Sequence, residues 1–176
     1  MYDALESDAH NKGEDKHRFA ENEYFKDAVC LNTRGEIQAK AMGEHIQRIK
    51  LPIGPIISSP SCRARQTANL AFGGYSKLDR DLVHIGPYNE SLDRRVEILK
   101  SLYQELPLES NKNTIVSAHN SVIIPQIFKN KNDISNGLKL EEGGFYVISR
   151  DPKTKELRLE HEFHTYNDFN RQFYPR

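Results

Sequence analysis

The segment 54–68, with the sequence GPIISSPSCRARQTA, constrains the fold most strongly. Its short apolar run predicts a strand over Pro55–Ser58, and the residues after Pro60 favour a helix that carries Arg63 near its start. Helix N-termini attract anions through outward-pointing N–H groups and the helix dipole, and a guanidinium fork matches phosphate oxygens. The segment therefore predicts an anion site on an α/β fold. Taken alone, it leaves open an ordinary surface arginine on a strand–helix connection.

A second predicted strand ends in a histidine. Residues Thr114–Ala118 form an apolar run, and His119 follows directly. Ligands bind outside the carboxyl ends of strands in open α/β sheets, although a lone histidine there is more often structural. With Arg63 at another strand end, the pattern predicts a shared site. Arg63 would hold a phosphoryl group, and His119 would donate a proton or a hydrogen bond to the same oxygens.

Three strand–helix units in succession predict an α/β fold, a mostly parallel sheet with helices on both faces. The first helix is expected to begin with a capping box at Thr33 and Glu36 and to end before Pro52. Its expected apolar face is Ile37, Ala41, Ile46 and Ile49, with His45 at the surface. The helix that carries Arg63 is expected to end at Gly73–Gly74, where glycine accepts a left-handed cap.

Further elements follow in the second half of the chain. A helix from Leu92 is expected to end before Pro107, with Arg94 and Arg95 on its exposed face. Strands are predicted over 145–149 and 156–161, the second as an edge strand. The tail from Tyr166 carries aromatic residues that could pack on the domain.

Residues 31–43 supply a third motif: a leucine, a short turn with glycine, and Gln-Ala on a helix. With the two segments above, residues 31–150 resemble the histidine phosphatase superfamily in the order and spacing of their motifs. The resemblance implies a three-layer, phosphoglycerate-mutase-like fold and phosphomonoester hydrolysis without metal or cofactor. It assigns the stabilisation of phosphoryl charge to Arg63 and His119. The matching residues are Leu31, Gly35, Gln38, Ala39, Ser58, Ser59, Pro60, Arg63, Ala64, Thr67, Ala68 and 114–119.

The chain departs from the superfamily at its nucleophile. No Arg-His-Gly or Arg-His-Ala motif occurs in the 176 residues. Counting back from Leu31, Asp3 falls near the position of the nucleophilic histidine. Either the first strand is lost through truncation or a late start, or the chain is a diverged member with an altered nucleophile. The resemblance thus implies a phosphatase of weak or lost activity, with a non-catalytic phospho-ligand-binding or protein-interaction domain as the alternative.

No clear motif in the sequence identifies the proton donor to the leaving group. In many superfamily members the region that corresponds to the loop expected over 75–90 supplies this acid. Glu90 is the candidate and Asp81 its alternative, each weighed against an ordinary surface carboxylate. A serine hydrolase that uses Ser58 or Ser121 with His119 is a more distant reading, because the Gly-x-Ser-x-Gly elbow is absent.

Length and composition limit the number of domains and the classes of binding partner expected for the chain. The length predicts one domain over 1–176, with residues 5–28 as a polar loop. The balance of 25 basic and 25 acidic residues gives no basic bias for nucleic acid, and no apolar run suits a membrane span. No signal peptide is visible, so we expect a cytoplasmic protein with a small phosphorylated substrate or ligand. Cys30 and Cys62 fit no zinc pattern, and Cys62 is interpreted as a small filler residue.

Overall fold

The computed structural model describes residues 30–82, 91–119, 123–128 and 140–173. Its chain divides into two compact units. The first comprises Met1–Glu90 and Pro107–Asn120, and the second comprises Ser91–Leu106 and Ser121–Arg176. The expectation of a single domain over 1–176 stays a prediction.

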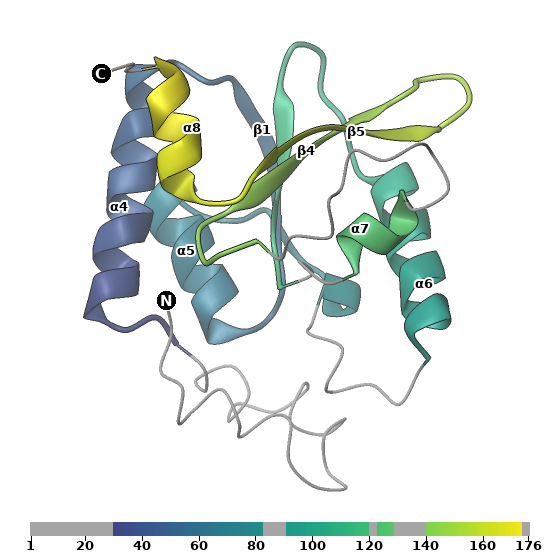
Figure 1. Ribbon diagram of the computed structural model, residues 1–176, viewed down its shortest axis with the longest axis horizontal. Coiled ribbons are helices and arrows are strands. Elements are labelled where there is room, and N and C mark those ends of the chain that lie inside the picture. The colour runs from purple at the N-terminus through teal and green to yellow at the C-terminus, as the bar shows by residue number, and fades with distance from the viewer. Residues whose placement is uncertain (1–29, 83–90, 120–122, 129–139, 174–176) are drawn as a thin grey trace, which may run out of the picture. The chain divides into compact units, whose positions relative to one another are not determined.

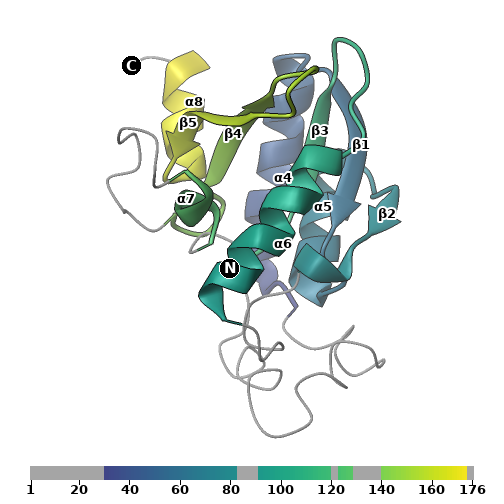
Figure 2. The ribbon, with the colours of Figure 1, turned by 90° about the vertical axis from the view of Figure 1, so that its right-hand side faces the viewer.

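The first unit contains a parallel three-stranded sheet in the order β2-β1-β3 (Figure 2). Strand β1 (Ile53–Ser58) pairs with β2 (Lys77–Leu78) and with β3 (Asn113–Ser117). Ser58 lies opposite both Leu78 and Ser117, so the three strands end at one edge of the sheet. The α/β class is therefore confirmed. The short strand β2 lies in a segment that the sequence predicts as a loop.

Two helices of the first unit pack against each other, α4 (Thr33–Arg48) and α5 (Cys62–Phe72) (Figure 1). The predicted cap of α4 is wrong by one residue, because Asn32 is the N-cap and its Oδ1 accepts from the Gly35 N–H at 2.9 Å. The predicted end of α5 is confirmed. Gly73 closes the helix with a φ of 81°, a conformation that glycine adopts without a Cβ clash.

The buried face of α4 differs from the predicted one. Ile46 is buried as expected, but Ile37 is 63% exposed and His45 is buried. Small residues, Gly35, Ala39 and Gly43, form most of the buried stripe. They are spaced at i, i+4 and i+8, so they lie on one side of the helix. The stripe lets α4 approach the backbone of α5, where a Cβ on Gly43 would lie 2.7 Å from the Ala71 carbonyl oxygen.

In its described residues, the second unit combines an antiparallel hairpin with three helices (Figure 1). Its elements are α6 (Leu92–Glu105), α7 (Ile124–Ile127), β4 (Phe145–Arg150), β5 (Leu157–Phe163) and α8 (Tyr166–Phe173). The tail is thus a helix, whose Phe169 ring contacts Phe145 and Phe163. Arg94 lies exposed beside Glu97 as expected, whereas Arg95 is completely buried, which corrects its predicted place on the exposed face.

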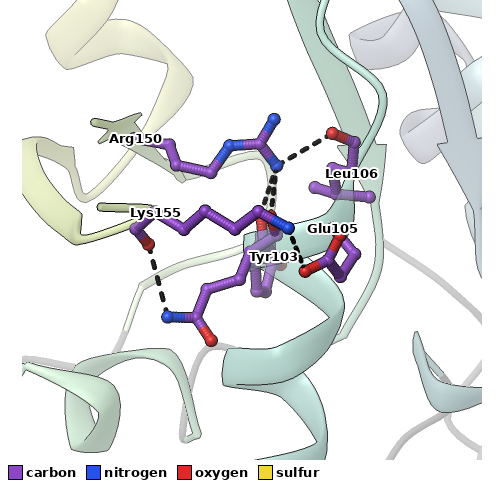
Figure 3. Close-up of polar contacts among 6 residues, drawn as sticks. Tyr103, Glu105, Leu106, Arg150 and Lys155 are labelled. Carbon is purple, nitrogen blue, oxygen red and sulfur yellow. Dashed lines mark hydrogen bonds and ion pairs between the residues drawn. The ribbon is translucent and has the colours of Figure 1, made fainter. Parts of the chain in front are cut away.

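Arg150, the last residue of β4, closes the C-terminal end of α6 (Figure 3). Its Nη1 donates to the carbonyl oxygens of Tyr103, Gln104 and Leu106 at 3.2, 2.7 and 2.9 Å. The last carbonyls of a helix have no intrahelical donor, and a cation there also complements the helix dipole. Next to this contact, the Lys155 ammonium donates to the Glu105 carboxylate at 2.5 Å. These contacts fasten the hairpin to α6.

Arg150→Met is expected to lower the free energy of unfolding by about 2 kcal/mol, because helix carbonyls lose a charged donor while the side-chain length is kept. Urea denaturation followed by circular dichroism measures the loss. Arg158→Met, which changes an exposed arginine of the same hairpin, is the matched control and should stay within about 0.5 kcal/mol. Equal losses in the two variants would contradict a specific capping role for Arg150.

Candidate functional site

Arg63 and His119 lie in direct contact, although 56 residues separate them in the sequence. The Nε of Arg63 donates to the Nδ1 of His119 at 2.9 Å. Arg63 is the second residue of α5, which follows β1, and His119 lies just beyond β3. Because β1 and β3 are parallel neighbours, their carboxyl ends bring both side chains to one edge of the sheet. Both residues are half-buried and so keep a part of their surface in solvent.

Two serines complete the cluster, which we call the Arg63–His119 site. The Oγ of Ser61 lies 2.6 Å from the Nε2 of His119, and the Oγ of Ser59 lies 3.1 Å from the same atom. Ser61 is the N-cap residue of α5, yet its side chain makes no capping bond there. The hydroxyl that would usually close the helix start is thus directed to the histidine instead. Ser59 belongs to the sequence motif, but nothing in the sequence singles out Ser61.

The direction of these bonds assigns the tautomer of His119. A guanidinium can only donate, so the Nδ1 of His119 must accept. The neutral ring then carries its hydrogen on Nε2 and donates to the serine hydroxyls. In this form the ring donates to Ser59 and Ser61, whereas the general base of a serine hydrolase accepts a proton from its serine. Ser58 points elsewhere, since its hydroxyl donates to the Ser59 carbonyl oxygen, and Ser121 lies outside the described residues.

Buried hydrogen bonds fix the elements that carry the site. The Ser59 N–H donates to the Ser117 carbonyl oxygen at 2.8 Å, and the Ser117 hydroxyl donates to the Ala64 carbonyl oxygen at 2.9 Å. The first turn of α5 is therefore tied to the end of β3. Ser59, Ser61 and Ser117 are all buried. Functional side chains on such anchored elements keep their geometry better than those on loops.

A disulfide joins Cys30 to Cys62, the first residue of α5. The interpretation of Cys62 as a filler residue is therefore wrong. A short bond lies beside it, because the Leu31 N–H donates to the Gln66 Oε1 at 2.6 Å. A lone pair of cysteines, each next to a motif residue, was the available signal. The expected cytoplasmic location stays a prediction, and in a reducing compartment the same pair would be two thiols.

Acidic residues also occupy this edge of the sheet. Asp79 follows β2, and its N–H donates to the Ser58 carbonyl oxygen at 2.9 Å. Its carboxylate accepts from Lys77, and this hydrogen bond and charge raise the pKa of the Lys77 ammonium. Asp79 also accepts from the backbone of Asp81, the alternative proton donor, which lies in the 3-10 helix η2 (Arg80–Leu82). Glu90 and Asp3, at the predicted proton-donor and nucleophile positions, lie outside the described residues.

Neither a metal-binding cluster nor a membrane-spanning helix occurs in the part of the chain that the structure describes. In the described ranges no group of three or more histidine, cysteine or acidic residues is arranged to hold a metal ion. None of the helices within the described part of the chain is long and apolar enough to cross a membrane. The geometry therefore leaves the Arg63–His119 site as the cluster that the sequence motifs and the fold both point to.

Comparisons with known proteins bear on the family and on the fold. The family model for the histidine phosphatase superfamily (branch 1) matches residues 20–84, which include Arg63. No curated protein sequence matches the chain. The fold is similar to that of the protein histidine phosphatase SixA solved with tungstate, with a TM-score of 0.55 and 13% identity over 81% of this chain and 88% of that one.

A second structure, a phosphohistidine phosphatase SixA from Agrobacterium tumefaciens described as putative, aligns with a TM-score of 0.47 and 19% identity over 82% of this chain and 88% of its own. The family match rests on sequence, and the likeness to the tungstate complex establishes the fold. The predicted resemblance to the histidine phosphatase superfamily is thereby confirmed at the level of a sequence match over residues 20–84. The chain has a fold similar to that of the protein histidine phosphatase SixA solved with tungstate.

Proposed function

We propose that this chain binds the phosphoryl group of a phosphorylated ligand at the Arg63–His119 site, in the manner of a phosphomonoester phosphatase of the phosphohistidine type. The observation that carries the proposal is the 2.9 Å bond between Arg63 and His119 at the carboxyl ends of two parallel strands. Such strand ends are where open α/β sheets bind ligands. The SixA structure solved with tungstate, a tetrahedral oxyanion like phosphate, adds support from a protein of the same fold.

The donors of the cluster explain how an oxyanion would be held. A guanidinium carries five N–H donors in a planar fork, and the bond to His119 uses one of them. The Nε2–H of His119 and the hydroxyls of Ser59 and Ser61 add donors on the other side of the ring. An entering phosphoryl group would replace the Arg63–His119 bond with two charge-assisted bonds from the Arg63 guanidinium to its oxygens. Such bonds are about twice as strong as neutral ones.

Binding and turnover require separate predictions. Arg63 and His119 can stabilise phosphoryl charge, but hydrolysis in this superfamily also needs a nucleophilic histidine. The 176 residues contain no Arg-His-Gly or Arg-His-Ala motif, and Asp3 stands near that position. Loss of a nucleophile from a cooperating set costs on the order of 10⁶-fold in rate. We therefore expect oxyanion binding with negligible hydrolysis, and Glu90 would serve as proton donor only where turnover occurs.

A non-catalytic phospho-ligand-binding domain is the second candidate, favoured by the missing motif. An assay with an aryl phosphate separates the two. Turnover that falls sharply in a His119→Gln variant would establish a phosphatase that uses another nucleophile. Tungstate binding without turnover would establish the binding domain. A chain that does neither would refute the proposed function altogether.

Tungstate binding is expected to tighten as the pH falls, because protonation of His119 would add a second cation to the site. A second proton on His119 would sit on Nδ1, facing the Nε–H of Arg63, so the bond between the two side chains breaks. Both cations are then available to the anion, and affinity should rise by about tenfold. Isothermal titration calorimetry at several pH values measures the change.

His119→Gln provides the control for this pH profile, because the amide keeps hydrogen-bonding groups and does not titrate. We expect this variant to bind tungstate more weakly and with a nearly flat profile between about pH 6 and 8. A slope as steep as that of the unmodified chain would assign the pH dependence to another group.

A further inference from the structure

The disulfide and the Arg63–His119 site share a few consecutive residues. Cys62 stands between Ser61, which contacts the Nε2 of His119, and Arg63, which contacts its Nδ1. Its partner Cys30 lies three residues before the first residue of α4, at a sequence separation of 32 residues from Cys62. These are the only two cysteines in the sequence, so they can pair only with each other within one chain. The disulfide is thus centred on the backbone that positions both donors.

A second link reaches the same part of α5. The Leu31 N–H donates to the Gln66 Oε1 at 2.6 Å, one helical turn beyond Cys62. The covalent link and the hydrogen bond together hold residues 30 and 31 on the start of α5. Of the two, only the disulfide responds to the redox state. Cys62 is buried at 7% exposure, whereas Cys30 is half-buried, so a reductant reaches the disulfide from the Cys30 side.

We propose that the Cys30–Cys62 disulfide is a positioning element of the Arg63–His119 site, so that its reduction by a dithiol weakens oxyanion binding. The proposal rests on the proposed function. In the oxidised chain, a covalent restraint on Cys62 limits the movement of the flanking Ser61 and Arg63. On reduction, the first turn of α5 keeps the buried bond from Ser117 to the Ala64 carbonyl but loses its restraint at Cys62. A less organised site must order its donors when the anion binds, which lowers affinity.

The redox step is a two-electron thiol–disulfide exchange. One thiolate of the dithiol attacks the Sγ of Cys30 and forms a mixed disulfide, and the Sγ of Cys62 leaves and takes up a proton. The second thiol of the reductant then attacks its own sulfur in the mixed disulfide and releases the Cys30 thiol. The reductant ends as a cyclic disulfide, and the chain gains two thiols.

Tungstate calorimetry on the full chain tests the proposal in three states: oxidised, reduced with excess dithiothreitol, and as the Cys30→Ser/Cys62→Ser variant. A thiol assay checks that the reduced chain has two free thiols. We expect reduction to weaken binding by about three- to tenfold, since about 1 kcal/mol of ordering cost corresponds to that change. The double variant should match the reduced chain and ignore dithiothreitol, and reoxidation should restore affinity. Gln66→Leu, which keeps the disulfide, should retain the response to dithiothreitol.

A second readout separates positioning from a general loss of structure. The ¹⁵N shifts of the His119 ring report its tautomer, and they should move on reduction while the far-ultraviolet circular dichroism stays constant. Equal tungstate affinity in all three states would overturn the proposal and leave the proposed function standing. Affinity that falls only in step with the folded fraction would overturn it as well. Failure of the oxidised chain to bind tungstate would instead refute the proposed function.

Discussion

Arg63→Ala is expected to lower the affinity of the chain for tungstate by about 100-fold, or about 2.7 kcal/mol. Hydrogen bonds to charged groups contribute about 1.5–3 kcal/mol each, and a guanidinium fork can form two to one oxyanion. The substitution also removes the donor that holds the Nδ1 of His119. Calorimetry at a pH near 7 measures the loss, and circular dichroism verifies that the helical content is unchanged.

Arg48→Ala is the matched control for this substitution. Arg48 is the last residue of α4 and is exposed, so the variant loses the same charge away from the site. Its tungstate affinity should stay within about twofold of the unmodified chain, because exposed charges act weakly through screened solvent. Arg63→Lys keeps the charge without the fork and should fall between the two. If Arg48→Ala and Arg63→Ala weaken binding equally, the anion is attracted by net charge and not by a built site.

The sequence predicts the two main residues of the site, Arg63 and His119, because each follows a recognisable local pattern. Arg63 follows a Ser-Ser-Pro turn, and His119 follows an apolar strand, and parallel strands end at a common edge. The contacts around them are not local. The disulfide of Cys62 and the bonds of Ser61 and Ser59 to His119 connect residues that lie 32, 58 and 60 positions apart. No spacing rule encodes such pairs, so only the folded chain reveals them.

The helices also show both features that the local sequence determines and features that depend on a neighbouring helix. Gly73 ends α5 through its own backbone preference, a property that the sequence displays. The buried face of α4 depends on its neighbour α5, whose buried residues include the small Ala64, Ala68 and Ala71. Large apolar residues such as Ile37 would hold two such helices apart, whereas Gly43 lets them meet. The count of large apolar residues is therefore right for Ile46 and wrong for Ile37, because close packing of these two helices favours small residues.

Gly43→Val is expected to lower the free energy of unfolding by about 3 kcal/mol. A Cβ at Gly43 would lie 2.7 Å from the Ala71 carbonyl oxygen and 3.0 Å from both the Ala71 Cα and the Leu70 carbonyl oxygen. These are backbone atoms of a helix, which cannot turn away as a side chain can. Replacing glycine by alanine in a helix gains about 0.5–1 kcal/mol, and valine gains less than alanine, so the clash must exceed that gain. Urea denaturation measures the difference.

Two further variants test whether the backbone is the obstacle. Gln47→Val changes an exposed position one turn along α4 and should cost less than about 1 kcal/mol. Adding Ala71→Gly to Gly43→Val should restore nothing, because the clashing atoms are not in the Ala71 side chain. Recovery of stability in that double variant would place the conflict between side chains and contradict a close approach of α4 to the α5 backbone. Because α5 carries Arg63, displacement of α5 in the Gly43→Val variant should also weaken tungstate binding. Gly43 of α4 would thus affect the anion site through the position of α5.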